Sequence, residues 1–157
     1  MSVRQSAPSP GRGGMGSPAV YAAVPRPAAY AYLADPRNRP EWQASLARVE
    51  LLDDGPPRVG MRWVDHLHGG LRFRLRITEL VPDVVWAESG SLGPLTAVVR
   101  LHFDDAERGG VPGTRVRIVV RVRGRGVARP LGWLATGMLS AAVRVELPRL
   151  VRVLEAR

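Results

Sequence analysis

The sequence predicts an α+β domain, an antiparallel β-sheet of about six or seven strands covered on one face by a long C-terminal helix. Two observations predict this class. Between residues 45 and 124, apolar and polar residues alternate in five or six segments, which turn signals such as HGG, VPD and SLGP separate. After Arg129 the apolar residues recur at helical spacing instead. The length of 157 residues fits one domain with one core.

The region before the sheet predicts one strand and two short helices. AVYAAV, beginning at Ala19, is a short strand candidate. Pro25 and Pro27 favour the start of a helix, and Pro36 lies just beyond its end. The DPRNRPEW stretch is rich in turn residues and leads into a second short helix that ends near Trp42.

Arginine occupies one face of the predicted strands. In the last strand, four apolar residues alternate with four arginines: Val116, Ile118, Val120 and Val122 with Arg115, Arg117, Arg121 and Arg123. The segment LRFRLRI repeats this alternation. Side chains alternate across a strand, so one face of the sheet is dry and the other is solvated. A second layer must cover the dry face, and only the long C-terminal helix is large enough to do so.

The last predicted element is that helix. Its apolar residues recur every three or four positions: Leu131, Leu134, Met138, Ala142 and Val145. Pro148 lies inside it and removes one backbone donor, so a kink is expected there.

Composition limits the function classes. The net charge of +9 suggests an anionic partner, but all 23 basic residues are arginine, and Ala, Gly, Pro and Val are also abundant. This usage is typical of a GC-rich coding sequence, so the arginine face is either functional or compositional. Without cysteine, the chain has no disulfide framework and no thiolate metal site. Residues 1–17 predict a disordered tail before a domain over 18–157. No segment resembles a secretory signal or a bilayer span, so a cytoplasmic protein is expected.

Four segments together resemble the START-like, or SRPBCC, superfamily, and most closely its polyketide cyclase/dehydrase and lipid-transport branch. They are AAYAYLADPRNRPEW, VELLDDGPPRVGMRWV, RITELVPDVVWAESG and GTRVRIVVRV, and the resemblance covers about residues 18–156. It implies a helix-grip fold, in which a curved sheet wraps around the long helix and leaves an apolar cavity between them. Members of the superfamily bind lipids, sterols, polyketides, hormones or quinone-like molecules, and some are aromatase/cyclases. They share no single catalytic motif, so no catalytic residue is carried over.

Strand parity, with the Trp63 face set inward by the resemblance, predicts the residues that bind the ligand. They are Trp42, Trp63, Phe73, Leu75, Trp86, Glu88, Ala97, Val99, Leu101, Val120, Leu134, Met138 and Ala142. Small residues at Ala97, Ala141 and Ala142, opposite large aromatic residues, would leave space for the ligand. The same residue types would also fill an ordinary core, so the cavity itself is an expectation from the resemblance.

Asp65 is the candidate catalytic residue. It lies between Trp63 and Leu67 on the predicted inner face, where an unpaired carboxyl costs several kcal/mol and its pKa is expected to rise. Such a group could serve as a general acid or base toward an enolisable ligand. Alternatively, Asp65 is solvated at the strand end or paired with an arginine. Glu88 has the same ambiguity, and Arg100 is the nearest candidate counter-charge if a bulge turns it inward.

Other kinds of site are less well supported. His66 and His68 have a usable metal-ligand spacing but no third ligand, so neither a metal nor a cofactor is expected. The arginine face has almost no interleaved aromatic residues to stack on bases, which argues against nucleic acid as a partner. The segment PLGWLATGML resembles an interfacial membrane element, and the alternative is the buried first half of the long helix. The oligomeric state stays open.

Three functions remain open. The leading prediction is binding of a hydrophobic small molecule, such as a lipid, polyketide or isoprenoid, between the sheet and the helix. The second is a cyclase or dehydratase without metal, in which an inward acid or base such as Asp65 moves protons. The third is an interaction module that uses the arginine face.

Overall fold

The structure, a computed structural model, describes residues 17–157. It contains one sheet of seven strands: β1 (Ala19–Ala22), β2 (Leu46–Leu51), β3 (Arg62–Leu67), β4 (Arg72–Val81), β5 (Val85–Leu92), β6 (Leu95–Arg108) and β7 (Val111–Gly124). The helices are α1 (Arg26–Ala34), α2 (Arg39–Trp42) and α3 (Leu131–Glu155), with short 3₁₀ turns at Pro36–Asn38 and Gly126–Ala128. Apart from Ser17, the predicted disordered tail lies outside the described residues.

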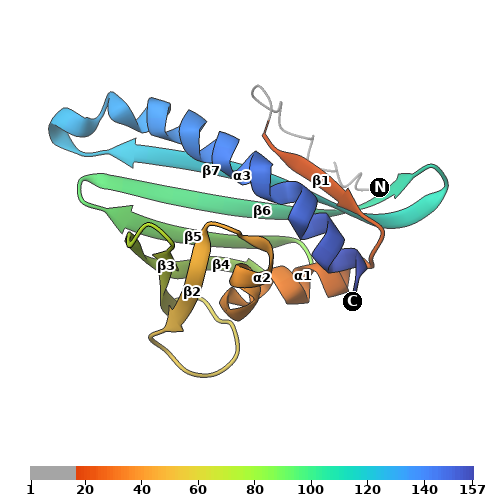
Figure 1. Ribbon diagram of the computed structural model, residues 1–157. Helices are drawn as coiled ribbons and strands as arrows, with labels where there is room; N and C mark the ends of the chain where they lie inside the picture. Colours follow the sequence, from red (N-terminus) through yellow and green to blue (C-terminus); the bar gives the residue numbers. More distant parts are fainter. Residues whose placement is uncertain (1–16) are drawn as a thin grey trace, which may run out of the picture.

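The predicted architecture is confirmed. The strands form one antiparallel sheet in the order β1-β7-β6-β5-β4-β3-β2, and the sheet curves around α3, as Figure 1 shows. The short helices α1 and α2 follow the first strand and lie at the end of the sheet near the C-terminus.

The two faces of the sheet divide as the alternation predicts. Val116, Ile118 and Val120 of β7 are buried, whereas the four arginines between and beside them are exposed. On β4, the alternating arginines Arg72, Arg74 and Arg76 are likewise exposed. The arginine face is therefore the solvated face of the sheet.

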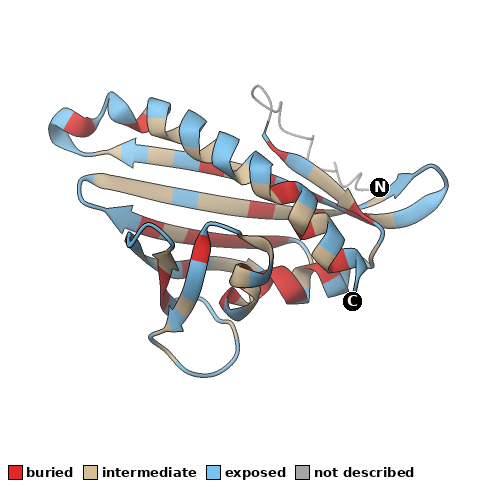
Figure 2. Ribbon diagram, in the orientation of Figure 1, coloured by how far each residue is buried: buried red, intermediate tan, exposed pale blue. Residues whose placement is uncertain are grey.

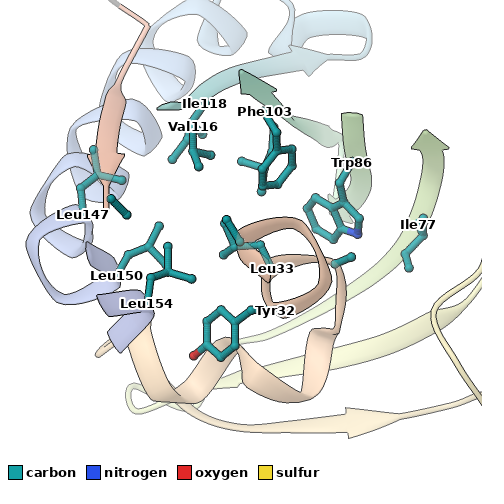
Figure 3. Packing of buried hydrophobic residues seen from close by; sticks show 14 of the residues in the cluster. Tyr32, Leu33, Ile77, Trp86, Phe103, Val116, Ile118, Leu147, Leu150 and Leu154 are labelled. Atoms are coloured by element: carbon teal, nitrogen blue, oxygen red, sulfur yellow. The ribbon is translucent and has the colours of Figure 1, made fainter. Parts of the chain in front are cut away.

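The packed core lies at one end of the sheet, where the second half of α3 meets α1. Leu147, Leu150 and Leu154 of α3 are buried there. Figure 3 shows them beside residues from α1 and from the strands: Tyr32, Leu33, Trp86, Phe103, Val116 and Ile118. α3 continues through Pro148 as one helix, so the proline does not end it.

The first half of α3 packs less closely. Leu131 and Leu134 are 53% and 49% exposed, and Figure 2 draws much of this half in pale blue. The expectation of a buried first half is therefore wrong for these two leucines. No helix between residues 17 and 157 has both the length and the apolarity that a bilayer span needs. The transient membrane contact suggested for this segment stays a prediction.

A hydrogen bond fixes the first half of α3 to the edge of β7. The N–H of Val122 donates to Thr136 Oγ1 at 2.8 Å, and the Thr136 hydroxyl donates to the carbonyl of Gly132 at 2.8 Å. Gly132 lies so close to β7 that a Cβ there would be 2.8 Å from the Val122 carbonyl oxygen. The start of the helix thus touches the strand backbone, while the residues that follow leave space over the sheet.

Candidate ligand-binding cavity

A cavity of about 500 Å³ lies between the first half of α3 and the inner face of the sheet. The wall on the helix side is a single stripe of residues: Ala135, Met138, Leu139, Ala142 and Val143. Their three- and four-residue spacing places them on one face of the helix. A volume of this size is typical of sites for small molecules.

Most of the predicted lining residues surround this cavity. Those on its wall are Trp42, Phe73, Leu75, Trp86, Glu88, Ala97, Val99, Leu101, Met138 and Ala142, and Asp65 lies there too. They come from six elements, β3, β4, β5, β6, α2 and α3, which the curvature of the sheet brings together. The strand parity that placed Trp63 inward is the reason why these positions share one side.

Three predicted residues do not line the cavity. Trp63 is fully buried in the core, where its ring centroid lies 6.4 Å from that of Trp86. Val120 faces inward but belongs to the packed core. Leu134 is one position off the helical stripe and is half-exposed, and Ala141 is likewise one position off the stripe. Strand parity placed Trp63 and Val120 on the correct face of the sheet. It did not distinguish the inner residues that border the cavity from those that pack in the core.

The remaining wall residues were not predicted. They are Leu33, Arg39, Gln43, Ser45, Leu46, Leu67, Gly90, Ser91, Leu92, Leu95, Ile118, Val122, Ala135, Leu139 and Val143. Several continue the parity of predicted neighbours, as Ile118 and Val122 do beside Val120. The helix stripe would have followed from centring the apolar face on Leu139 instead of Leu134.

The polar end of the cavity is a buried ion cluster of Arg39, Asp65 and Glu88. Arg39 Nη1 donates to Glu88 Oε2 at 2.7 Å, and Arg39 Nη2 donates to Asp65 Oδ2 at 2.9 Å. Asp65 Oδ1 also accepts a hydrogen bond from Trp63 Nε1 at 2.9 Å. The arginine and both acids are nearly inaccessible to solvent, so each charge depends on the others for compensation.

Arg39 reaches this position because the segment between α1 and β2 turns tightly. Asp35 Oδ1 caps the turn by accepting from the backbone N–H of Arg37 at 3.0 Å, and the Asn38 side-chain amide donates to the Tyr32 carbonyl at 2.8 Å. Pro36 begins the 3₁₀ turn and Pro40 lies in the first turn of α2, positions that suit proline. The Arg39 guanidinium then lies 5.6 Å from the centre of the Trp63 ring.

The counter-charge of the inner acids is not Arg100, which the sequence offered as a candidate only if a bulge turned it inward. Arg100 does not turn inward: it forms an ion pair with Glu79 instead. The residue that neutralises the inner acids comes from α2, in the turn-rich stretch where the sequence predicted a short helix but no inward charge. The sequence held only an indirect signal for this arginine. Two acids on the buried face of the sheet require a cation, and no inward position of the sheet carries one, so the cation had to come from another element.

The two acids differ in their hydrogen bonds. Both oxygens of Asp65 accept hydrogen bonds, from Trp63 and from Arg39. Glu88 Oε2 accepts from Arg39, but no group among residues 17–157 donates to Glu88 Oε1. The pKa of Glu88 is raised to about 7, mainly because burial disfavours the charged form; Arg39 offsets part of the rise, and the charge of Asp65 adds to it. Glu88 is therefore the acid of the cluster with an open oxygen and with a proton equilibrium near neutral pH.

The two histidines of β3 and its following turn are not gathered around an ion. His66 Nε2 lies 2.8 Å from Glu50 Oε2, at the edge of the sheet. Within the described part of the chain, no three His, Cys, Asp or Glu side chains are grouped so that they could hold a metal.

Comparison with known proteins bears on both the fold and the cavity. Residues 19–155 match the family profile described as polyketide cyclase/dehydrase and lipid transport. No curated protein sequence gives a significant match. Among solved structures, the crystal structure of Ara h 8.0201 is similar with a TM-score of 0.67 and 12% identity, covering 89% of this chain and 96% of that one. The protein DR_A0006 from Deinococcus radiodurans has a TM-score of 0.58 and 24% identity, covering 88% and 95%.

A third similar structure is DynU16, described as a putative protein in the dynemicin biosynthetic locus. Its TM-score is 0.60 at 18% identity, and the match covers 87% of this chain and 45% of DynU16. At identities this low, the likenesses establish the helix-grip fold and not a function, because one fold hosts many functions.

Proposed function

The chain belongs to the polyketide cyclase/dehydrase and lipid transport family, and from that premise we propose that it binds a hydrophobic small molecule in the cavity between the sheet and α3. The observation that carries this proposal is a cavity of about 500 Å³ whose wall is mostly apolar and has its charged side chains, Arg39, Asp65 and Glu88, grouped at one end. A packed core would fill this space with side chains.

Burial of apolar surface supplies the affinity. A ligand with about 200 Å² of apolar surface gains about 5 kcal/mol from burial, before the cost of association is subtracted. The polar end of the cavity then fixes the orientation of the ligand, which is the usual division of labour in such sites.

The route into the cavity passes beside the first half of α3. Met138 and Leu92 line the cavity and are also 69% and 43% exposed, so they mark its mouth. Leu92 ends β5, close to the turn that leads into β6. A ligand would enter between this turn and the helix.

The direct test is to purify the protein from its own host, denature it, extract it with organic solvent and identify any stoichiometric small molecule by mass spectrometry. Ala142→Trp would place an indole at the cavity wall, and Ala141→Trp is its matched control, because both alanines are exposed but only Ala142 lies on the wall. We expect the wild type and Ala141→Trp to retain the molecule and Ala142→Trp to lose it. Equal retention by both variants would contradict the proposal.

Catalysis is the second candidate function, and the open oxygen of Glu88 favours it. A carboxyl with a pKa of about 7 can exchange a proton with a bound ligand at neutral pH. Glu88 Oε1 would take a proton from a carbon beside a ligand carbonyl, giving an enolate and a neutral acid, and would then return the proton. The catalytic role first assigned to Asp65 passes to Glu88 in this proposal, because both Asp65 oxygens are occupied.

Proton exchange can be measured without knowing the natural substrate. The probe is 2-tetralone, an apolar ketone, whose exchange of protons for deuterium in heavy water is followed by NMR. An enzyme of this kind would accelerate the exchange, and Glu88→Gln would abolish the acceleration while Asp65→Asn kept part of it. No acceleration by the wild type would leave binding as the function.

A further inference from the structure

Glu88 keeps one carboxylate oxygen available to the cavity. Its Oε2 lies 2.7 Å from Arg39 Nη1, whereas within residues 17–157 no donor reaches Oε1. The side chain is only 5% exposed and lies on the cavity wall. Oε1 is not among the side-chain atoms that the protein covers completely, so a donor in the cavity can reach this oxygen and form the hydrogen bond that the protein does not supply.

The polar side-chain atoms near the cavity that are completely buried without partners do not compete for the ligand. Trp86 Nε1 and Arg39 Nε are donors, and Gln43 Oε1 is an acceptor, but each is covered by protein atoms. A molecule in the cavity therefore meets Glu88 Oε1 before it meets any of them.

The charges around Glu88 are few. Arg39 from α2 and Asp65 from β3 face it; the residues opposite it on β4 and β6 are Ile77 and Val99, and the wall from α3 is apolar. With both acids ionised, the cluster carries one negative charge more than Arg39 neutralises. A ligand carboxylate would bring a second uncompensated negative charge into a region of low dielectric.

We infer that the cavity selects a neutral, otherwise apolar ligand with a hydroxyl group, whose O–H donates to Glu88 Oε1, and that it rejects ligands with a carboxylate at that end. This inference rests on the proposed function, since it names the ligand class of the same cavity. It separates hydroxylated ring compounds and alcohols from fatty acids.

Three bicyclic probes of similar shape test the inference by isothermal titration at about pH 8, where Glu88 is mostly ionised. 2-Naphthol donates a hydrogen bond, 2-methoxynaphthalene cannot donate, and 2-naphthoate carries a negative charge. We expect 2-naphthol to bind about tenfold more tightly than the methoxy compound, the factor that one hydrogen bond to a charged group supplies. We expect 2-naphthoate to be at least as weak as the methoxy compound.

The second arm varies pH between about 5.5 and 8.5, a range over which 2-naphthoate stays ionised, as ordinary carboxylic acids do. Protonation of Glu88 below about pH 7 removes the excess negative charge, so the wild type should bind 2-naphthoate more tightly as pH falls. Glu88→Gln should bind it independently of pH. Glu79→Gln, the same substitution outside the cavity, is the control and should behave as the wild type does.

The outcomes separate the two proposals. If 2-methoxynaphthalene binds as tightly as 2-naphthol, or if 2-naphthoate binds more tightly than 2-naphthol at about pH 8, the hydroxyl inference is overturned and the apolar cavity stands. If none of the probes binds up to its solubility limit, the proposed function fails and the inference fails with it. The inference is supported only by the stated order of affinities together with the loss of pH dependence in Glu88→Gln.

Discussion

Arg39 and Glu88 are 49 positions apart in the sequence, yet Arg39 Nη1 donates to Glu88 Oε2 at 2.7 Å in the interior of the protein. This contact ties the short helix α2 to the centre of the sheet. Because the same guanidinium also binds Asp65, one buried cation holds two acids in place at the polar end of the cavity. The stability of this end and its chemistry therefore depend on the same side chain.

Replacing the cation is expected to destabilise the fold. Arg39→Met leaves both acids without their buried cation, and the loss of one member of a buried ion pair typically costs about 3–5 kcal/mol. Urea unfolding at neutral pH measures the change, and the deficit should shrink in acid, where the carboxyls are protonated. The control is Arg37→Met, the same substitution at an exposed arginine two positions earlier, and it should leave stability unchanged. A stable Arg39→Met variant would show that the cluster does not support the fold.

Glu88 should make the stability depend on pH. Its pKa in the folded protein, about 7, lies above the value of 4.5 for an unperturbed glutamate, so the folded state binds the proton more tightly. The contribution of Glu88 is then favourable below about pH 4.5 and is lost as pH rises toward 7. Glu88→Gln has no carboxyl to ionise at this position, so its stability does not decline in this way. The stability of the variant minus that of the wild type should therefore increase between about pH 4.5 and 7, by roughly a few kcal/mol at most.

The measurement is a series of urea unfolding curves for both proteins between about pH 4.5 and 8. Groups outside the cluster titrate alike in the two proteins, so the difference between the curves reports Glu88 together with its coupling to Asp65 and Arg39. A difference that stays constant with pH would mean that the pKa of Glu88 is not raised in the folded protein.

Thr136 is expected to control the opening of the cavity. It accepts the N–H of Val122, which lies on β7 beyond the residues that pair with β1 and would otherwise be an open sheet edge. Thr136→Val keeps the shape of the side chain and removes the acceptor. We expect faster amide exchange at Val122 and faster release of bound 2-naphthol, measured by hydrogen exchange and stopped flow. Ser140→Ala, on the same helix, is the control, and equal effects of the two changes would contradict this role.

The sheet and the long helix could be predicted from the sequence because each leaves a periodic signal. Alternation places Val116, Ile118 and Val120 on one face of β7, and the structure keeps them there. The position of Arg39 leaves no such signal, since a single residue in a turn-rich segment has no period to fit. The same holds for the boundary between cavity and core: Trp63 and Trp86 both face inward, and only the path of α3 decides which of them borders empty space.

The arginine face offers the last prediction, because two of its residues oppose each other. Arg62 and Arg76 are directly paired across β3 and β4, and like charges at such positions repel. Arg62 is compensated, since its side chain donates to both oxygens of Asp53 and its backbone N–H donates to one of them, whereas Arg76 has no ion pair within the described residues. Removing the uncompensated charge should therefore relieve repulsion, and threonine suits a strand well.

We expect Arg76→Thr to leave the urea midpoint unchanged or to raise it, and Arg62→Thr to lower it through loss of the Asp53 contacts. Added salt screens exposed charges, so any gain from Arg76→Thr should shrink as ionic strength rises. A lower midpoint for Arg76→Thr at every salt concentration would show that Arg76 has a stabilising partner. The expected result would mean that the arginine face is not maintained for stability, which leaves composition or a binding partner as the reason for its charge.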